Sequence, residues 1–436
     1  MAKTIALLLV LAISLACVAC NTGTDNQTPA SNVPASNAPA SNAPGSNAPS
    51  TSIPSNNVPT ASEPAGTFLI GTYLQLTGGN AIVGNAAKQG IDLAAKYINE
   101  NGGFNGATVE ILHYDTTGST EEAVKVVQKM LVNDAVDAVI GSVNSNEVSA
   151  VIPYLNEAEI YNFGLGTSAT WMADTSRVWT FRASANNGQI APLGVDLIKQ
   201  LNFSTVAIIN GTDDTGSSTA DAFEQACHEK GVTVTTRQQC DSDDTDFSGQ
   251  ISQILATDPD CIYMSLIGTT FGPFVRQLRN SGYKGMLAAK ETFNLDYMQV
   301  AGIENSNYIF YSYPYVTYTE IADCTIPIMI DFLNRFYAEF NAMPAHEAAY
   351  RGWDTMMSMW EASKVAGSNE KTALRDAMPR VKLDGLGGPL DYTRGDREGY
   401  SEFYSFVLVD GKNILLDDWL AAGGYQSYLA DTGRDR

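Results

Sequence analysis

The sequence predicts an α/β protein in which strands and helices alternate through two successive units. The first unit is expected within residues 68–165, where helices carry apolar residues at helical spacing, as at Ile91, Ala94 and Ile98. The alternation starts afresh with a strand at 205–210. Strands that alternate with helices form mainly parallel sheets flanked by helices, and such sheets bind ligands beyond the carboxyl ends of their strands.

The first unit places small hydroxyl residues at those strand ends. Its strands are expected at residues 68–76, 108–114, 135–141 and 160–165. A helix is expected at about 86–99, and another follows Ser119, which forms a capping box with Glu122: each side chain is expected to accept from the other residue's backbone amide. The third strand runs into 142–145 and the fourth into 166–168, both rich in serine or glycine.

The second unit repeats this pattern. Its strands are expected at residues 205–210, 232–238, 261–266 and 284–289. A loop at 211–216 follows its first strand, and its last strand ends at Lys290 and Glu291. An extended aromatic stretch, two helices, a glycine-rich turn and a final strand are expected beyond, at residues 308–315, 326–340, 348–366, 385–390 and 402–409. Two such units imply a cleft between them, a common place for a small-molecule site.

The charge of the chain excludes one class of partner. The formal net charge is −22 over 436 residues, and no long acidic run appears. This balance repels phosphate backbones, so we expect no nucleic-acid partner and interpret the acidic residues as a solvated surface.

Residues 1–20 are interpreted as a targeting segment. Lys3 provides a positive start, and the apolar run 5–16 is too short to span a bilayer stably. The following residues resemble the lipobox of bacterial lipoproteins, which implies lipidation at Cys20, with Cys17 as the alternative. The alternative is an ordinary secretory signal. Under either interpretation, the protein is exported from the cytoplasm.

Residues 21–65 are rich in Pro, Ser, Ala, Asn and Thr, with prolines at five-residue spacing from Pro29 to Pro49. Such a segment cannot bury a core, so we predict a disordered tether. A tether behind a lipidated cysteine indicates a protein held outside a cell membrane.

Several motifs together resemble the type I periplasmic binding proteins of ABC importers, specifically the leucine/isoleucine/valine-binding branch. They cover about 68–417 in the family's order and spacing. They are Leu76–Gly79, Gly90–Ala94 with Ile98–Gly103, Ile140–Ser142, Gly164–Ser168, Ala349–Asp354 and Asp384–Pro389.

The resemblance implies two lobes joined by three hinge crossings, which close over a ligand. Lobe 1 would comprise residues 66–183 and 315–387, and lobe 2 residues 184–314 and 388–436. The crossings are expected near 182–184, 311–315 and 388–390.

The resemblance also implies ligand-binding residues. Ser145 and Ser168, with the backbone around Gly166, would bind a carboxylate, since hydroxyls and backbone amides both present donors to an anion. Glu291 would accept from a ligand ammonium, and Tyr313 would line the cleft near the hinge. The alternatives are local helix capping for the serines and a surface Glu paired with Lys290 for Glu291.

This sequence departs from the family at the side-chain pocket. Thr215, which we also expect to bind the ligand, stands where the family commonly has an aromatic residue over it. The aromatic residues expected near Val83 and in 266–268 are absent. Aliphatic amino acids remain the first ligand class that the resemblance implies, and the departures leave another amino acid, a small amide or a short peptide as alternatives.

No residue pattern indicates catalysis, so we expect a protein that is not an enzyme and has no cofactor. His113, His228 and His346 lack metal spacing and are interpreted as surface or capping residues. No Gly-x-Ser-x-Gly elbow occurs. Cys227 and Cys240 could form a disulfide in an exported protein.

The sequence thus predicts an extracytoplasmic solute-binding lipoprotein that captures a branched-chain or other small amino acid and delivers it to ABC permease subunits. A ligand-binding sensory receptor component is the alternative.

Overall fold

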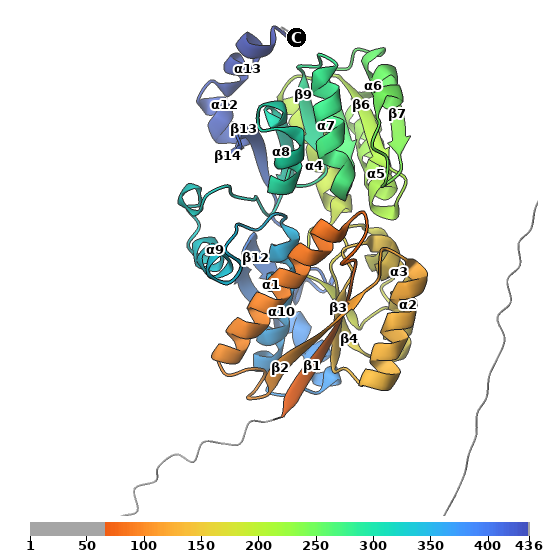
Figure 1. Cartoon of the computed structure of the whole chain (residues 1–436), viewed down its shortest axis with the longest axis vertical. Coiled ribbons are helices and arrows are strands. Elements are labelled where there is room, and N and C mark those ends of the chain that lie inside the picture. The colour runs from red at the N-terminus through yellow and green to blue at the C-terminus, as the bar shows by residue number, and fades with distance from the viewer. Residues whose placement is uncertain (1–65, 435–436) are drawn as a thin grey trace, which may run out of the picture. The chain divides into compact units, whose positions relative to one another are not determined.

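The computed structural model describes residues 66–434 (Figure 1). The predicted signal segment, Cys20 and the tether lie outside the described residues. The described chain contains a five-stranded sheet, a seven-stranded sheet and a two-stranded hairpin. Each of the two larger sheets is flanked by helices (Figure 1), and we call each sheet with its helices a lobe. The predicted α/β class with mainly parallel sheets is confirmed.

The first lobe is built on a parallel sheet of strand order β2-β1-β3-β4-β5. Its strands are β1 Thr67–Leu74, β2 Thr108–Asp115, β3 Ala138–Gly141, β4 Tyr161–Gly164 and β5 Thr180–Arg182. Its helices are α1 Ala81–Glu100, α2 Thr120–Lys129 and α3 Ser145–Glu157, joined by the later α10 Ala348–Ala366 and α11 Lys371–Ala377. Every residue of β3 and β4 is buried, and β3 is accordingly a continuous apolar run rather than an alternating one.

The second lobe is built on a sheet of order β14-β13-β10-β9-β8-β6-β7. Its strands are β6 Thr205–Gly211, β7 Thr233–Cys240, β8 Cys261–Ser265, β9 Met286–Ala289, β10 Ile309–Tyr313, β13 Tyr404–Val409 and β14 Lys412–Leu415. The last two are antiparallel to their neighbours, and the others are parallel. Its helices are α4 Asn187–Gln200, α5 Asp214–Lys230, α6 Ser248–Leu255, α7 Phe271–Asn280, α8 Leu295–Ala301, α12 Leu416–Ala421 and α13 Gly424–Thr432.

The chain passes between the sheets three times within the described residues. The first passage lies at 183–186 and the second follows β10, which itself belongs to the second sheet. The expected third crossing at 388–390 is wrong, because β12 Gly388–Asp391 pairs with β11 Lys382–Gly385 in a hairpin. The third passage therefore lies between Asp391 and Tyr404. The predicted lobe boundaries otherwise stay a prediction.

Two local predictions are corrected. The Ser119 side chain accepts from the Glu122 amide (3.3 Å) as expected, but the return bond is absent because the Ser119 amide donates to the Thr116 carbonyl (2.9 Å). The expected loop at 211–216 is shorter, because Asp213 caps α5 by accepting from the Gly216 amide (2.9 Å).

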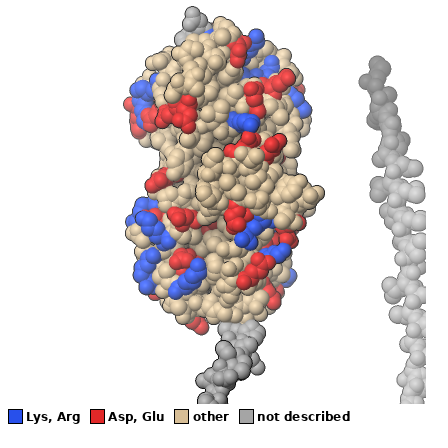
Figure 2. Space-filling model, turned by 90° about the vertical axis from the view of Figure 1, so that its left-hand side faces the viewer, with Lys and Arg blue, Asp and Glu red and all other residues tan. Residues whose placement is uncertain are grey.

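The described chain contains four buried free thiols, those of Cys227, Cys240, Cys261 and Cys324. The possible disulfide between Cys227 and Cys240 is therefore not formed. Within residues 66–434, no helix has the length and apolar character needed to cross a membrane. On the face shown in Figure 2, acidic and basic side chains are interspersed.

Candidate ligand-binding site

A cavity of about 640 Å³ lies between the two lobes at the carboxyl ends of their strands. Its volume falls in the range of small-molecule sites. The first lobe contributes Gln75, Asn80, Val143, Asn144, Ser145, Asn146, Glu147 and Thr167, among others. The second contributes Asp213, Thr215, Asp243, Ile267, Gly268, Thr269, Lys290, Glu291 and Tyr297, and the start of α10 contributes His346 and Arg351.

Ser145 is the first residue of α3, directly after the loop that follows β3. Its side chain is 1% exposed, and its Oγ accepts a hydrogen bond from the Ser168 amide (3.2 Å). The hydroxyl hydrogen remains available to a ligand, because a serine hydroxyl both accepts and donates. A Cβ on Gly166 would lie 2.6 Å from this Oγ, so glycine is what lets the two loops approach.

Ser168, Gly166 and Tyr313 do not line the cavity. The Ser168 hydroxyl lies 2.8 Å from the Thr170 hydroxyl and 3.1 Å from that of Ser218, so it faces the contact between the lobes. Tyr313 is fully buried, and its hydroxyl accepts from Arg351 (3.2 Å). The direct ligand contacts expected of these residues stay a prediction.

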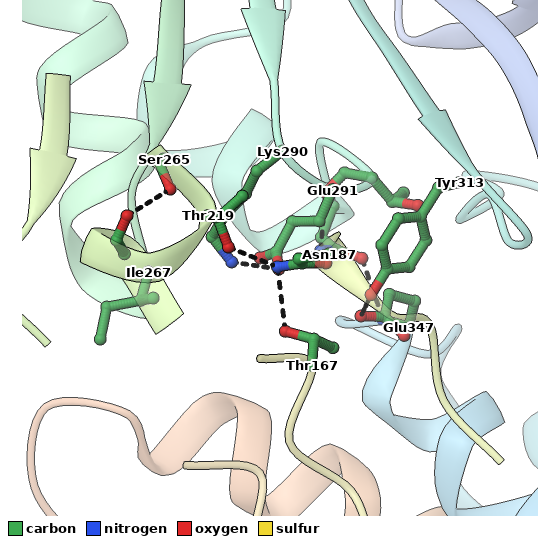
Figure 3. A network of polar contacts seen from close by, with 12 residues as sticks. Thr167, Asn187, Thr219, Ser265, Ile267, Lys290, Glu291, Tyr313 and Glu347 are labelled. Carbon is green, nitrogen blue, oxygen red and sulfur yellow. Dashed lines mark hydrogen bonds and ion pairs between the residues drawn. The ribbon is translucent and has the colours of Figure 1, made fainter. Parts of the chain in front are cut away.

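Thr167, the residue before Ser168, does line the cavity. Its hydroxyl accepts from the Asn187 amide (3.1 Å), which also approaches the Thr219 hydroxyl (3.2 Å). Figure 3 shows Asn187 between Thr167 of the first lobe and Thr219 of the second. This amide therefore connects the two lobes through Thr167, which lines the cavity.

Glu291 and Thr215 line the cavity, as Ser145 does. Both oxygens of the Glu291 carboxylate have partners, since Lys290 Nζ lies 2.6 Å from Oε2 and the Tyr297 hydroxyl donates to Oε1 (3.0 Å). Burial raises the pKa of this carboxyl, but Lys290 and Arg351 hold it below its ordinary value. Glu291 is thus a buried carboxylate with a partner from its own chain.

His346 lies behind this group. Its Nδ1 accepts from the Ala348 amide (3.0 Å), so it caps α10, and its Nε2 lies 3.0 Å from the Tyr297 hydroxyl. Burial lowers its pKa to about 3, which keeps the ring neutral. The capping interpretation is therefore confirmed for His346, while the surface interpretation is wrong because the residue is 1% exposed.

Arg351 and Glu347 form a second buried ion pair in the first turns of α10. Arg351 also donates to the Leu165 carbonyl (3.2 Å) at the end of β4. Arg351 therefore bonds to groups of the protein itself, and these bonds hold the start of α10 against the strand ends of the first lobe.

The opposite wall is a network of amides around one carboxylate. The Asn144 amide donates to Gln75 Oε1 (2.7 Å) and Glu147 Oε1 (3.1 Å), and Asn80 donates to Asn144 Oδ1 (2.7 Å). Burial raises the pKa of Glu147. These side chains provide a polar wall with no positive charge.

Sequence reasoning missed Lys290, Tyr297, His346 and Arg351 as cavity residues. Lys290 was considered only as a partner of a surface Glu291, although its place directly after a buried strand was a signal. His346 and Arg351 carried no local signal, because the return of α10 to the first lobe brings them to the cavity.

Comparisons with known proteins now define the class. A family model described as "Periplasmic binding protein" matches residues 67–413. The Leu/Ile/Val-binding protein homolog 3 of Brucella melitensis is 24% identical over 353 residues, which are 78% of this chain and 91% of that relative.

Two solved structures share the fold. The branched-chain amino acid transporter substrate-binding protein LivJ of Streptococcus pneumoniae, in complex with isoleucine, has a TM-score of 0.69 at 21% identity and covers 80% of this chain and 97% of its own. A solute-binding protein of an ABC transporter from R. palustris, in complex with benzoate, has a TM-score of 0.73 at 20% identity, with coverages of 80% and 95%.

Two α/β lobes with a polar cavity between them define a binding protein. The chain belongs to the periplasmic binding protein family, and its fold is the type I fold that the sequence predicted.

Proposed function

We propose that this protein is the extracytoplasmic solute-binding component of an ABC importer, which captures a small solute between its lobes and delivers it to the permease. The observation that carries the proposal is the cavity of about 640 Å³ at the strand ends of both lobes. Relatives named for leucine, isoleucine and valine binding, and fold neighbours described as transporter components, support the assignment.

The ligand would place a carboxylate at Ser145. The Ser145 hydroxyl has a hydrogen to donate, and α3 begins at this residue, where free backbone amides favour an anion. Isoleucine and benzoate, the ligands named for the two fold neighbours, share a carboxylate group. A branched-chain or other small amino acid is the class that the family resemblance implies, with Glu291 as the acceptor for its ammonium; amides and short peptides are the alternatives.

The protein would act by binding alone, and lobe closure around the ligand would create the surface that the permease recognises. A lipid on Cys20, followed by the tether of residues 21–65, would hold it at the outer face of the cell membrane. Mass spectrometry of the N-terminal peptide would test the anchor.

Thermal unfolding tests the binding function. A solute that binds only the folded state must raise the unfolding midpoint with concentration. The purified protein is measured against amino acids, amine-free carboxylates, amides and short peptides. A rise with one class, together with loss of uptake of that solute in cells lacking the gene, supports the importer assignment. A flat response to the whole panel contradicts it.

A further inference from the structure

Lys290 is paired with the carboxylate expected to bind a ligand ammonium. It follows β9 directly, its side chain is 1% exposed, and its Nζ lies 2.6 Å from Glu291 Oε2. Glu291 is the residue expected to bind an ammonium from the ligand. Figure 3 shows both side chains reaching into the same group of polar contacts.

Each oxygen of the Glu291 carboxylate already has a partner from the protein. Oε2 is bonded by Lys290 and Oε1 by the Tyr297 hydroxyl. The other cation that lines the described cavity, Arg351, is paired with Glu347. An incoming ammonium would therefore have to displace Lys290 or lie beside it, and like charges in a buried site repel strongly.

We propose that Lys290 is a built-in substitute for the ligand ammonium, so that the site selects small carboxylates or amides without an α-amino group over the corresponding amino acids. This inference rests on the proposed solute-binding function and specifies the ligand class of the same cavity. Lys290 acts as a specificity-determining residue, because its charge neutralises Glu291, the carboxylate expected to bind an amine.

The arrangement also explains why a lysine is tolerated there. A buried ammonium without a partner is costly, as is a buried carboxylate, and each removes the cost of the other. The pair completes the cavity wall before any ligand arrives, so the ligand needs no charge at that end. The Ser145 end is unaffected, because it belongs to the other lobe.

A matched series on one aliphatic skeleton tests this. L-Leucine carries an ammonium and a carboxylate, 4-methylpentanoate only the carboxylate, and 4-methylpentanamide neither charge. Corresponding pairs built on alanine, phenylalanine and glutamate extend the series. Affinities for the full chain are measured by calorimetry. We expect an amine-free compound to bind more tightly than the corresponding amino acid by roughly 10-fold or more. Comparing the amine-free carboxylate with the amine-free amide shows which of these two classes the site prefers.

Lys290→Met should reverse the preference. Because this variant leaves Glu291 without its cation, the leucine ammonium can supply the missing positive charge. The ratio of the leucine affinity to the 4-methylpentanoate affinity should rise by roughly 30-fold or more. Lys284→Met, an exposed lysine just before the same strand, is the matched control and should leave the ratio unchanged. If Lys290→Met is unstable, leucine should raise its unfolding midpoint more than 4-methylpentanoate does.

The double variant Lys290→Met/Glu291→Gln carries neither charge and should lose most of the discrimination. The proposal is overturned if the unaltered protein prefers amino acids, if no amine-free member binds, or if Lys290→Met leaves the ratio as it was. A clear preference for amino acids would leave the solute-binding function standing, whereas a flat response to every solute class would defeat both.

Discussion

Asn146 and Asp214 are joined by a hydrogen bond of 2.9 Å, in which the Asp214 amide donates to the Asn146 side chain. Asn146 lies in the first turn of α3 and Asp214 is the first residue of α5, so the bond connects the lobes beside the cavity. The Asp214 carboxylate also accepts from the Thr170 hydroxyl (3.0 Å). One residue of the second lobe therefore makes two hydrogen bonds to the first lobe.

Asn146→Ala should weaken ligand binding by about 3- to 10-fold, the effect of losing one hydrogen bond of about 1 kcal/mol. The loss should appear mainly as faster dissociation, because the bond links the two lobes and must break before they can separate. Stopped-flow measurements with the solute identified by thermal unfolding would check this. Asn334→Ala, on the surface helix α9 Pro327–Phe340, is the control. An unchanged dissociation rate in Asn146→Ala would show that this contact does not hold the lobes closed.

Ser145→Ala should reduce affinity by about 5- to 30-fold, because it removes the hydroxyl donor at the cavity wall. It should also lower the unfolding midpoint, since the Ser168 amide loses its acceptor. Calorimetry and thermal unfolding together separate the two effects. Ser252→Ala, an exposed residue of α6, should change neither. If affinity stayed the same while the midpoint fell, Ser145 would only hold the Ser168 loop in place and would not contact the ligand.

Gly90→Ala should destabilise the first lobe by about 2 kcal/mol or more, as overpacking does. Helices α1 and α10 touch here so closely that an added Cβ would lie 1.9 Å from the Ala349 carbonyl oxygen. Gly249→Ala is the matched control in α6, because its Cβ would meet nothing within 4 Å and alanine favours a helix. Urea unfolding measures both. Equal stabilities for the two variants would contradict the packing argument.

Gly90 also illustrates how much of the fold could be predicted from the sequence. The alternation of strands and helices and the apolar face of α1 followed from residue spacing, because both are local properties. The partner that requires Gly90 to lack a side chain lies about 260 residues away, so no local pattern could identify it.

The candidate site was predictable to a similar extent. Ser145, Thr215 and Glu291 follow strand ends in order, and the cavity lies where those ends meet. Their partners depend on three-dimensional packing. Tyr297 of α8 reaches Glu291, and His346, just before α10, reaches the Tyr297 hydroxyl. Ser168 was expected in the site, but the turn after β4 directs Thr167 into the cavity and Ser168 toward Ser218.

The final prediction concerns pH and a buried carboxyl near the hinge. Asp354 is 1% exposed in α10 and accepts from the Tyr400 and Tyr315 hydroxyls and the Leu386 amide. Burial raises its pKa from 3.8 to about 7. Between pH 3.8 and about pH 7, Asp354 keeps its proton in the folded protein but has lost it in the unfolded chain. The contribution of this group to the free energy of unfolding is therefore fully present below about pH 4 and is lost as the pH rises through 7.

Asp354→Asn should flatten that dependence, because asparagine resembles the protonated acid and cannot ionise. Relative to the unaltered protein, the variant should gain stability as the pH rises from 5 to 8, by up to ~1.4 kcal/mol per pH unit within the window. Urea unfolding at several pH values measures the slope, and Asp384→Asn, at an exposed position of the nearby hairpin, is the control. If the stabilities of the unaltered protein and of Asp354→Asn changed in parallel with pH, Asp354 would have the same pKa in the folded and unfolded states. That outcome would contradict the prediction.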